Sequence, residues 1–122
     1  MFDIDYIFKW VNPTKPGQPF SFWVSPCTLI FKDTFDLTIN VDSRGGTTNM
    51  FEIADLTLAE KVEQEKNNWI YEWNIDLQEG HIKLKSSGFD QIVRQKPIYT
   101  DGQTLTLEQR NGISFNQTPA SI

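Results

Sequence analysis

The chain has 122 residues, of which 39% are hydrophobic and 22% charged, and its formal net charge is −5. Its 11 basic residues are scattered along the sequence, which disfavours nucleic acids and anionic membranes as partners because both need a concentrated cationic surface. No apolar run approaches the roughly 18–20 residues that span a bilayer. The N-terminus also lacks a basic segment followed by an apolar one, so we expect a cytoplasmic protein.

Cysteine and histidine each occur once, so the sequence excludes an intramolecular disulfide bond and an ordinary structural zinc site. The glycine-rich patterns that bind dinucleotides and phosphates are absent as well, and we expect no metal and no cofactor. A chain of this length is typical of one domain. We therefore predict a single globular domain over residues 1–122, with residues 116–122 frayed.

Alternation of apolar and polar residues dominates the first part of the chain and predicts half-buried strands. One strand is predicted over residues 2–10, with its large apolar side chains on one face and its aspartates on the opposite, solvated face. The apolar face comprises Phe2, Ile4, Tyr6, Phe8 and Trp10, and the polar face Asp3, Asp5 and Lys9. Residues 12–19 contain three prolines and predict a loop, after which a strand resumes at residues 20–24.

Residues 27–42 have a pronounced strand pattern that is interrupted at residues 32–34. If this stretch is a hairpin, an odd loop with Phe31 opposite Leu37 keeps the apolar and polar side chains on separate faces. A single long strand bent at a bulge is the alternative.

A loop is predicted over residues 43–49, and a short helix is predicted soon after it. Thr57 and Glu60 have the spacing of a capping box, in which each side chain bonds to the backbone amide of the other residue. We therefore predict a helix over residues 58–66 whose charged residues face solvent.

Residues 69–86 are predicted to form a hairpin that turns at residues 78–81. Large apolar side chains occupy every second position of its first strand, and Leu77 ends that row. A loop with an even number of residues keeps the two faces sorted and sets Leu77 opposite Ile82.

The remaining elements complete an all-β pattern. A further strand is predicted over residues 89–95, and Leu105 and Leu107 belong either to a short strand or to a single helical turn that Gly112 ends. Many strands, one short helix and hairpin-type connections indicate an antiparallel β-sandwich or a partly open β-barrel.

The sequence contains no recognisable catalytic constellation, and we expect that the protein is not an enzyme. Cys27 follows Pro26 in a predicted strand, where a small buried thiol is common, and His81 lies in a predicted turn. A cysteine hydrolase needs these two groups within hydrogen-bonding distance of each other. The carboxylates of Asp3 and Asp5 are expected on a wet face rather than in the apolar wall that a catalytic acid needs.

Aromatic residues make up 13% of the chain and include four tryptophans. Trp69 and Trp73 share the apolar face of their strand, which favours a place in the core. Trp23 lies off the apolar face of its own strand, which indicates that a second layer or a partner covers it. The candidate ligand- or partner-binding residues are Trp23, Trp69, Tyr71 and Trp73.

Three stretches carry a resemblance to known proteins: Leu29-Ile30-Phe31 with Phe35-Asp36-Leu37-Thr38-Ile39, the segment Gly80-His81-Ile82-Lys83-Leu84, and Gly88-Phe89. Their pattern resembles that of small all-β bacterial proteins, some of which are immunity partners of secreted toxins. The resemblance covers half the chain, implies a non-catalytic domain that binds a protein partner, and assigns no functional residue. The alternative is a β-barrel or sandwich that binds a carbohydrate or lipid in an aromatic-lined pocket. Neither interpretation gives the oligomeric state.

Overall fold

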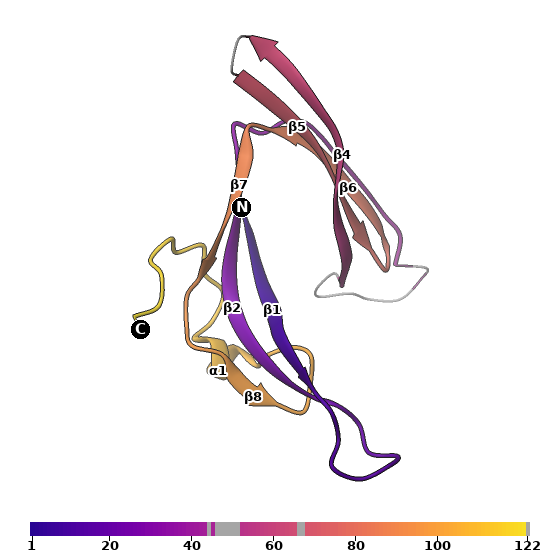
Figure 1. Cartoon of the computed structure of the whole chain (residues 1–122), viewed down its shortest axis with the longest axis vertical. Helices are drawn as coiled ribbons and strands as arrows, with labels where there is room; N and C mark the ends of the chain where they lie inside the picture. The colour runs from indigo at the N-terminus through magenta and orange to yellow at the C-terminus, as the bar shows by residue number, and fades with distance from the viewer. Residues whose placement is uncertain (44, 46–51, 66–67, 122) are drawn as a thin grey trace. The chain divides into compact units, whose positions relative to one another are not determined.

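The computed structural model describes residues 1–43, 45, 52–65 and 68–121, and these contain eight strands and one short helix (Figure 1). The elements are β1 (Phe2–Val11), β2 (Ser21–Lys32), β3 (Phe35–Val41), β4 (Ile53–Glu65), β5 (Asn68–Leu77), β6 (Gly80–Ser86), β7 (Gly88–Val93), β8 (Ile98–Thr100) and α1 (Leu107–Arg110). The predicted all-β class with antiparallel sheets and one short helix is confirmed. None of the helices among the described residues is long and apolar enough to cross a membrane.

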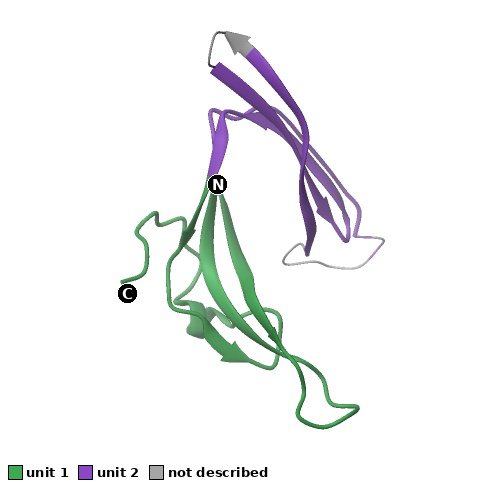
Figure 2. Ribbon diagram, viewed as in Figure 1, with its two compact units in different colours: residues 1–30, 90–122 green, residues 31–89 purple. Residues whose placement is uncertain are grey.

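The chain divides into two compact units (Figure 2). Unit 1 comprises residues 1–30 and 90–122, and unit 2 comprises residues 31–89. One sheet has the order β1-β2-β7, with β8 also paired to β2, and the other has the order β3-β6-β5-β4. Neither sheet closes into a barrel within the described part of the chain.

The central strand of unit 1, β2, is buried on both of its faces from Val24 to Leu29. One face packs against the C-terminal segment, where Leu105 joins Val24 in an apolar cluster. Thr28 Oγ1 on the same face donates a hydrogen bond to the Asn116 carbonyl oxygen at 2.7 Å. Residues 116–122 were expected to fray, and within the described part of that segment Asn116 and Ala120 are hydrogen-bonded to the rest of unit 1.

A bulge in β1 changes which side chains share a face. Ile7 is paired with Val24 but Lys9 is paired with Trp23, so Phe8 is an extra residue in β1. Trp10 consequently lies on the face of Phe22, with ring centroids 4.9 Å apart. The prediction of one continuous face from Phe2 to Trp10 is therefore wrong.

At its centre, the sheet of unit 2 sorts the side chains of β5 and β6 as the alternation predicts. Its apolar face has Ile82 and Ile75 side by side at the centre, where both are buried. On the opposite face Lys83 lies beside Asn74, and Asn74 lies beside Thr57. Most apolar side chains of the two edge strands remain exposed, including Ile39 of β3 and Leu58 of β4.

The hairpin between β5 and β6 has the predicted even loop, because Gln78 and Glu79 connect the strands. Its predicted register is wrong by two residues, since Leu77 is opposite Gly80 rather than Ile82. The ladder between β5 and β6 continues as far as Gly80, which is paired with Leu77 next to the turn. A Cβ at that position would lie 2.0 Å from the Asn40 carbonyl oxygen of β3, so only glycine fits there.

Two other local predictions are wrong. Residues 58–65 continue β4 along β5 instead of forming a helix, because pairing with a neighbouring strand outweighs the capping signal at Thr57. Neither alternative for residues 27–42 is found. The stretch is not a hairpin, because β2 pairs with β1 and β3 pairs with β6, and it is not one bent strand, because β2 ends at Lys32 and β3 begins at Phe35 in the other sheet. The loop predicted over residues 43–49 falls mostly outside the described residues.

A capping box does occur, at α1. Thr106 Oγ1 accepts a hydrogen bond from the Gln109 backbone amide, and Gln109 Oε1 accepts one from the Thr106 amide. Asn111 ends the helix in the left-handed conformation with φ of 59°, followed by Gly112. Of the two alternatives predicted for Leu105 and Leu107, a short strand or a helical turn, the helical turn is confirmed.

Candidate functional site

Unit 1 exposes four aromatic side chains on or beside one face of its sheet. Trp23 of β2 and Tyr99 of β8 are directly opposite each other, with ring centroids 5.4 Å apart. Tyr6 is opposite Ser25, which lies two residues from Trp23, so Tyr6 and Trp23 share a face. Phe8, the extra residue of the bulge, meets the Tyr6 ring edge-on at 5.0 Å. We call Tyr6, Phe8, Trp23 and Tyr99 the aromatic surface.

The aromatic surface is open to solvent, because its four side chains are between 39% and 51% exposed. Three of its members were not among the candidate residues from the sequence: Tyr6, Phe8 and Tyr99. Tyr6 and Phe8 have the same alternation as core residues, so the sequence carries no signal that distinguishes them. Tyr99 follows Pro97 in a polar stretch, where a short strand is hard to recognise.

The other three candidates lie together along β5 in unit 2. Tyr71 is next to Trp73, with ring centroids 6.0 Å apart. Lys61 of β4 places its Nζ atom 4.4 Å from the ring centroid of Trp69 and 5.6 Å from that of Tyr71. This is the geometry of a cation–π interaction, and it shields two of the three rings with a charged side chain of the same unit.

Trp73 is a structural residue by its contacts. Its Nε1 atom donates a hydrogen bond to Ser86 Oγ at 3.1 Å. Its ring lies 5.1 Å from Phe89, edge-on, and 6.1 Å from Phe31. Trp73 is therefore half-buried against neighbours in unit 2, whereas Trp69 at the start of the strand is 36% exposed.

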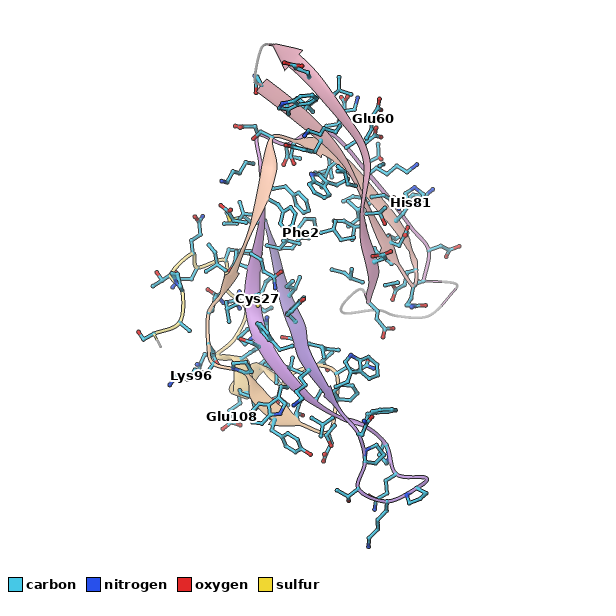
Figure 3. All side chains as sticks on the ribbon, viewed as in Figure 1. Phe2, Cys27, Glu60, His81, Lys96 and Glu108 are labelled. Carbon is cyan, nitrogen blue, oxygen red and sulfur yellow. The ribbon has the colours of Figure 1, made fainter. Side chains whose placement is uncertain are left out.

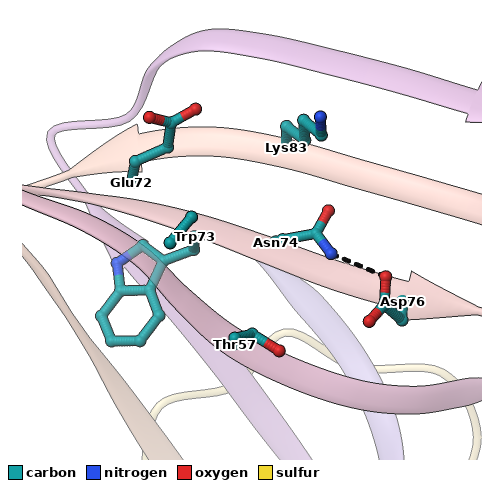
Figure 4. A pocket seen from close by; sticks show the side chains of 7 residues that line it. Thr57, Glu72, Trp73, Asn74, Asp76 and Lys83 are labelled. Atoms are coloured by element: carbon teal, nitrogen blue, oxygen red, sulfur yellow. Dashed lines mark hydrogen bonds between the residues drawn. The ribbon is translucent and has the colours of Figure 1, made fainter.

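A pocket of about 390 Å³ opens on the polar side of the same sheet (Figure 4). It is lined by Thr57, Ala59, Glu72, Trp73, Asn74, Asp76 and Lys83. Asn74 Nδ2 donates a hydrogen bond to Asp76 Oδ1 at 2.6 Å, while the buried Asn74 Oδ1 has no hydrogen-bond partner. Of the three aromatic residues predicted to line a carbohydrate or lipid pocket, Trp73 is among these lining residues, and Trp69 and Tyr71 are not.

Cys27 and His81 lie on β2 and β6 (Figure 3). Cys27 is fully buried, its thiol donates a weak hydrogen bond to the Ser25 carbonyl oxygen at 3.6 Å, and burial raises its pKa. A raised pKa opposes formation of the thiolate, which is the nucleophilic form. His81 is half-buried in a strand opposite Asp76, so its predicted place in the turn is wrong.

Asp3 and Asp5 form a buried ion-pair network instead of a wet face, which corrects the sequence prediction. Their side chains are only 6% and 12% exposed. Asp3 Oδ1 accepts a hydrogen bond from Arg94 at 2.7 Å and a shorter one from Arg110. Asp5 Oδ1 accepts a hydrogen bond from Arg110 Nε at 3.0 Å. Two carboxylates thus face two guanidinium groups, so the formal charges balance.

The network also holds the backbone of the C-terminal segment. Asp3 Oδ2 accepts a hydrogen bond from the Ser114 amide at 3.0 Å, and Asp5 Oδ2 accepts one from the Leu105 amide at 3.1 Å. Burial by itself raises the pKa of Asp3, but the hydrogen bonds from Arg110 and Arg94 outweigh it and lower the pKa below its usual value. A carboxylate held ionised in this way is suited to fastening the segment and not to donating a proton.

Within the described residues, no group of three or more histidine, cysteine, aspartate or glutamate side chains is placed to hold a metal ion. The candidate functional features are therefore the aromatic surface of unit 1 and the β5 row with its neighbouring pocket in unit 2. No protein-family model, curated protein or solved structure matches this chain.

Proposed function

We propose that this chain is a non-catalytic protein-interaction domain that binds its partner through the aromatic surface. The exposure of the four aromatic side chains on one sheet region carries the proposal. Tyrosine and tryptophan are enriched among the residues that dominate binding energy, and a cluster of exposed apolar rings is typical of a surface that another protein covers.

The aromatic surface supports this function better than the β5 row does. Trp73 already makes a hydrogen bond with Ser86, and Lys61 lies over Trp69 and Tyr71. Trp23 contacts another exposed ring, that of Tyr99, and both rings present area to solvent. An indole of this kind can be buried by a partner without first breaking a polar contact.

The resemblance to immunity-type proteins suggests a bacterial, cytoplasmic setting in which the partner is a toxin. The net charge of −5 favours a basic partner, because opposite charges accelerate the encounter of two proteins. We therefore expect a partner with an apolar patch surrounded by basic residues.

The test begins with identification of proteins that the wild-type chain retains from an extract of its native host. The affinity of the purified partner is then measured by calorimetry for the wild type and for Trp23→Ala. We expect the substitution to weaken binding by about 30-fold or more, which corresponds to the roughly 2 kcal/mol of a dominant interface residue. Circular dichroism establishes that the variant is folded.

Trp69→Ala is the matched control, because Trp69 is exposed to nearly the same extent as Trp23 but lies in unit 2. Its affinity for the partner should equal that of the wild type. Equal losses in both variants would contradict the proposed surface. Saturable quenching of tryptophan fluorescence by a glycan or fatty acid, abolished in Trp69→Ala, would favour the ligand-binding alternative instead.

A further inference from the structure

Strand β3 has an edge that is open for pairing with another strand. It is the first strand of its sheet, and within the described residues it pairs with β6 on one side only. In an antiparallel sheet, every second residue of an edge strand directs its amide and carbonyl groups away from the sheet. These groups form a template on which a further strand can be added.

The side chains of β3 are unusually exposed for a strand with this composition. All seven residues are exposed, and Ile39 is 58% exposed although it lies beside the buried Ile82. Val41 shares the face of Ile39 and is exposed too, and Leu37, two positions before Ile39, is likewise exposed. The apolar row at the centre of the sheet therefore continues to its edge and ends there uncovered.

The two edges of this sheet differ in how they are protected. Strand β4, at the opposite edge, has three register shifts and carries charged residues that include Glu60, Lys61 and Glu63. Charges and bulges are the usual means of preventing edge-to-edge pairing. Residues 37–41 of β3 contain no charged residue, proline or glycine, and the only shift in β3 precedes Thr38.

The sequence of β3 is complementary to itself when read in the antiparallel direction. If Ile39 faces Ile39 of a second copy, Leu37 faces Val41 and Thr38 faces Asn40. Directly opposite residues in antiparallel strands point to the same side of the sheet, so apolar pairs fall on one face and polar pairs on the other. Such an arrangement has two-fold symmetry, which closes after two copies.

We propose that a second copy of this chain pairs with β3 through residues 37–41, joining two four-stranded sheets into one sheet of eight strands. The pairing is limited to these residues because Asp36 of one copy would face Asp42 of the other. An interface of five residues per chain buries less than the roughly 1,200 Å² of stable complexes, so we expect weak association with a dissociation constant on the order of 100 µM. This inference is independent of the proposed function, which concerns unit 1.

Sedimentation equilibrium over a concentration range of about 10 µM to 1 mM tests the proposal. The apparent mass of the wild type should rise from 14.1 kDa toward twice that value. Ile39→Lys places two like charges opposite each other and should weaken association at least about tenfold. Leu58→Lys makes the same change at an exposed position of β4 and should associate like the wild type, as should Trp23→Ala.

Cross-linking tests the register. Directly opposite residues have Cβ atoms about 4.5–5.5 Å apart, close to the separation in a disulfide bond. Ile39→Cys should therefore form a covalent dimer under mild oxidation, while Leu58→Cys should not, and the buried Cys27 does not compete.

Three results would overturn the proposal. The first is a wild type that remains at 14.1 kDa at the highest concentration. The second is an Ile39→Lys variant that associates as the wild type does. The third is a monomeric wild type whose host partner is lost with Ile39→Lys and retained with Trp23→Ala, because β3 would then bind a different protein.

Discussion

The two units use the same alternation of residues in different ways. In unit 2 the apolar positions of β5 and β6 are buried at the centre of the sheet, and the alternate positions carry polar groups on the other face. In unit 1 both faces of β2 are covered from Val24 to Leu29, and the aspartates of β1 lie beneath the C-terminal segment. Where the ladder is regular, alternation thus reveals which side chains share a face, but it does not reveal whether the polar face is exposed to solvent.

The largest expected effect comes from breaking the buried ion pairs of unit 1. Asp3→Asn removes the carboxylate that pairs with Arg94 and leaves Arg110 paired with Asp5 only, so it should lower the free energy of unfolding by about 3–5 kcal/mol. Urea denaturation followed by circular dichroism measures this change.

The matched control is Asp36→Asn in unit 2, which removes an exposed ion pair with Lys85 at 3.2 Å. Asparagine tolerates the positive φ of 50° at this position, so the backbone should be unaffected. Its cost should be at most about 1 kcal/mol. Similar losses of unfolding free energy in the two variants would mean that the buried and the exposed ion pairs contribute equally to stability.

A smaller effect is expected at the centre of the sheet in unit 2. Ile75 is 1% exposed, and Ile75→Ala should cost about 3 kcal/mol because it removes buried apolar area and leaves a cavity. Leu58→Ala, at the exposed edge of the same face, should change the free energy of unfolding by less than about 0.5 kcal/mol. Differential scanning calorimetry of both variants would detect the difference, and equal costs would contradict a core centred on β5 and β6.

The smallest effect is a pH dependence specific to unit 1. Because the pKa of Asp3 is lower in the folded protein than its usual 3.8, its contribution to stability is complete above about pH 4 and is lost as the pH falls through the folded-state pKa. The difference in unfolding free energy between the wild type and Asp3→Asn should therefore be constant from pH 5 to 7 and shrink below about pH 4. A difference that grows in acid would show that the pKa is raised instead.

Features of the fold that depend on residues close together in the sequence could be predicted, and features that depend on residues far apart in the sequence could not. The faces of β5 and β6 and the even loop between them depend on neighbouring residues, and these were predicted correctly. The partners of Asp3 lie far away in the chain: Arg94 is 91 positions distant and Arg110 is 107 positions distant. No local sequence pattern indicates such a pairing. Aspartates at alternate positions are equally typical of a strand whose polar face is exposed to solvent.

The same reasoning explains the site residues that the sequence missed. The bulge at Phe8 changes the facing of every residue after it, but it leaves the alternation of residue types intact. The exposure of Tyr6 and Phe8 therefore cannot be read from their spacing. The strand at residues 58–65 was missed for a similar reason, because its pairing with β5 is decided by the tertiary structure and not by the capping signal at Thr57.

The ion-pair network also has a consequence for biosynthesis. Unit 2 is one continuous stretch of chain, whereas unit 1 combines the first 30 residues with residues 90–122. During translation, Asp3 and Asp5 must wait for Arg94, Arg110 and the amide of Ser114, which are made after all of unit 2. A nascent chain that stops between residues 89 and 110 would thus contain all residues of unit 2 but only part of unit 1. In that chain Asp3 and Asp5 of β1 would lack Arg110 as the partner that neutralises them.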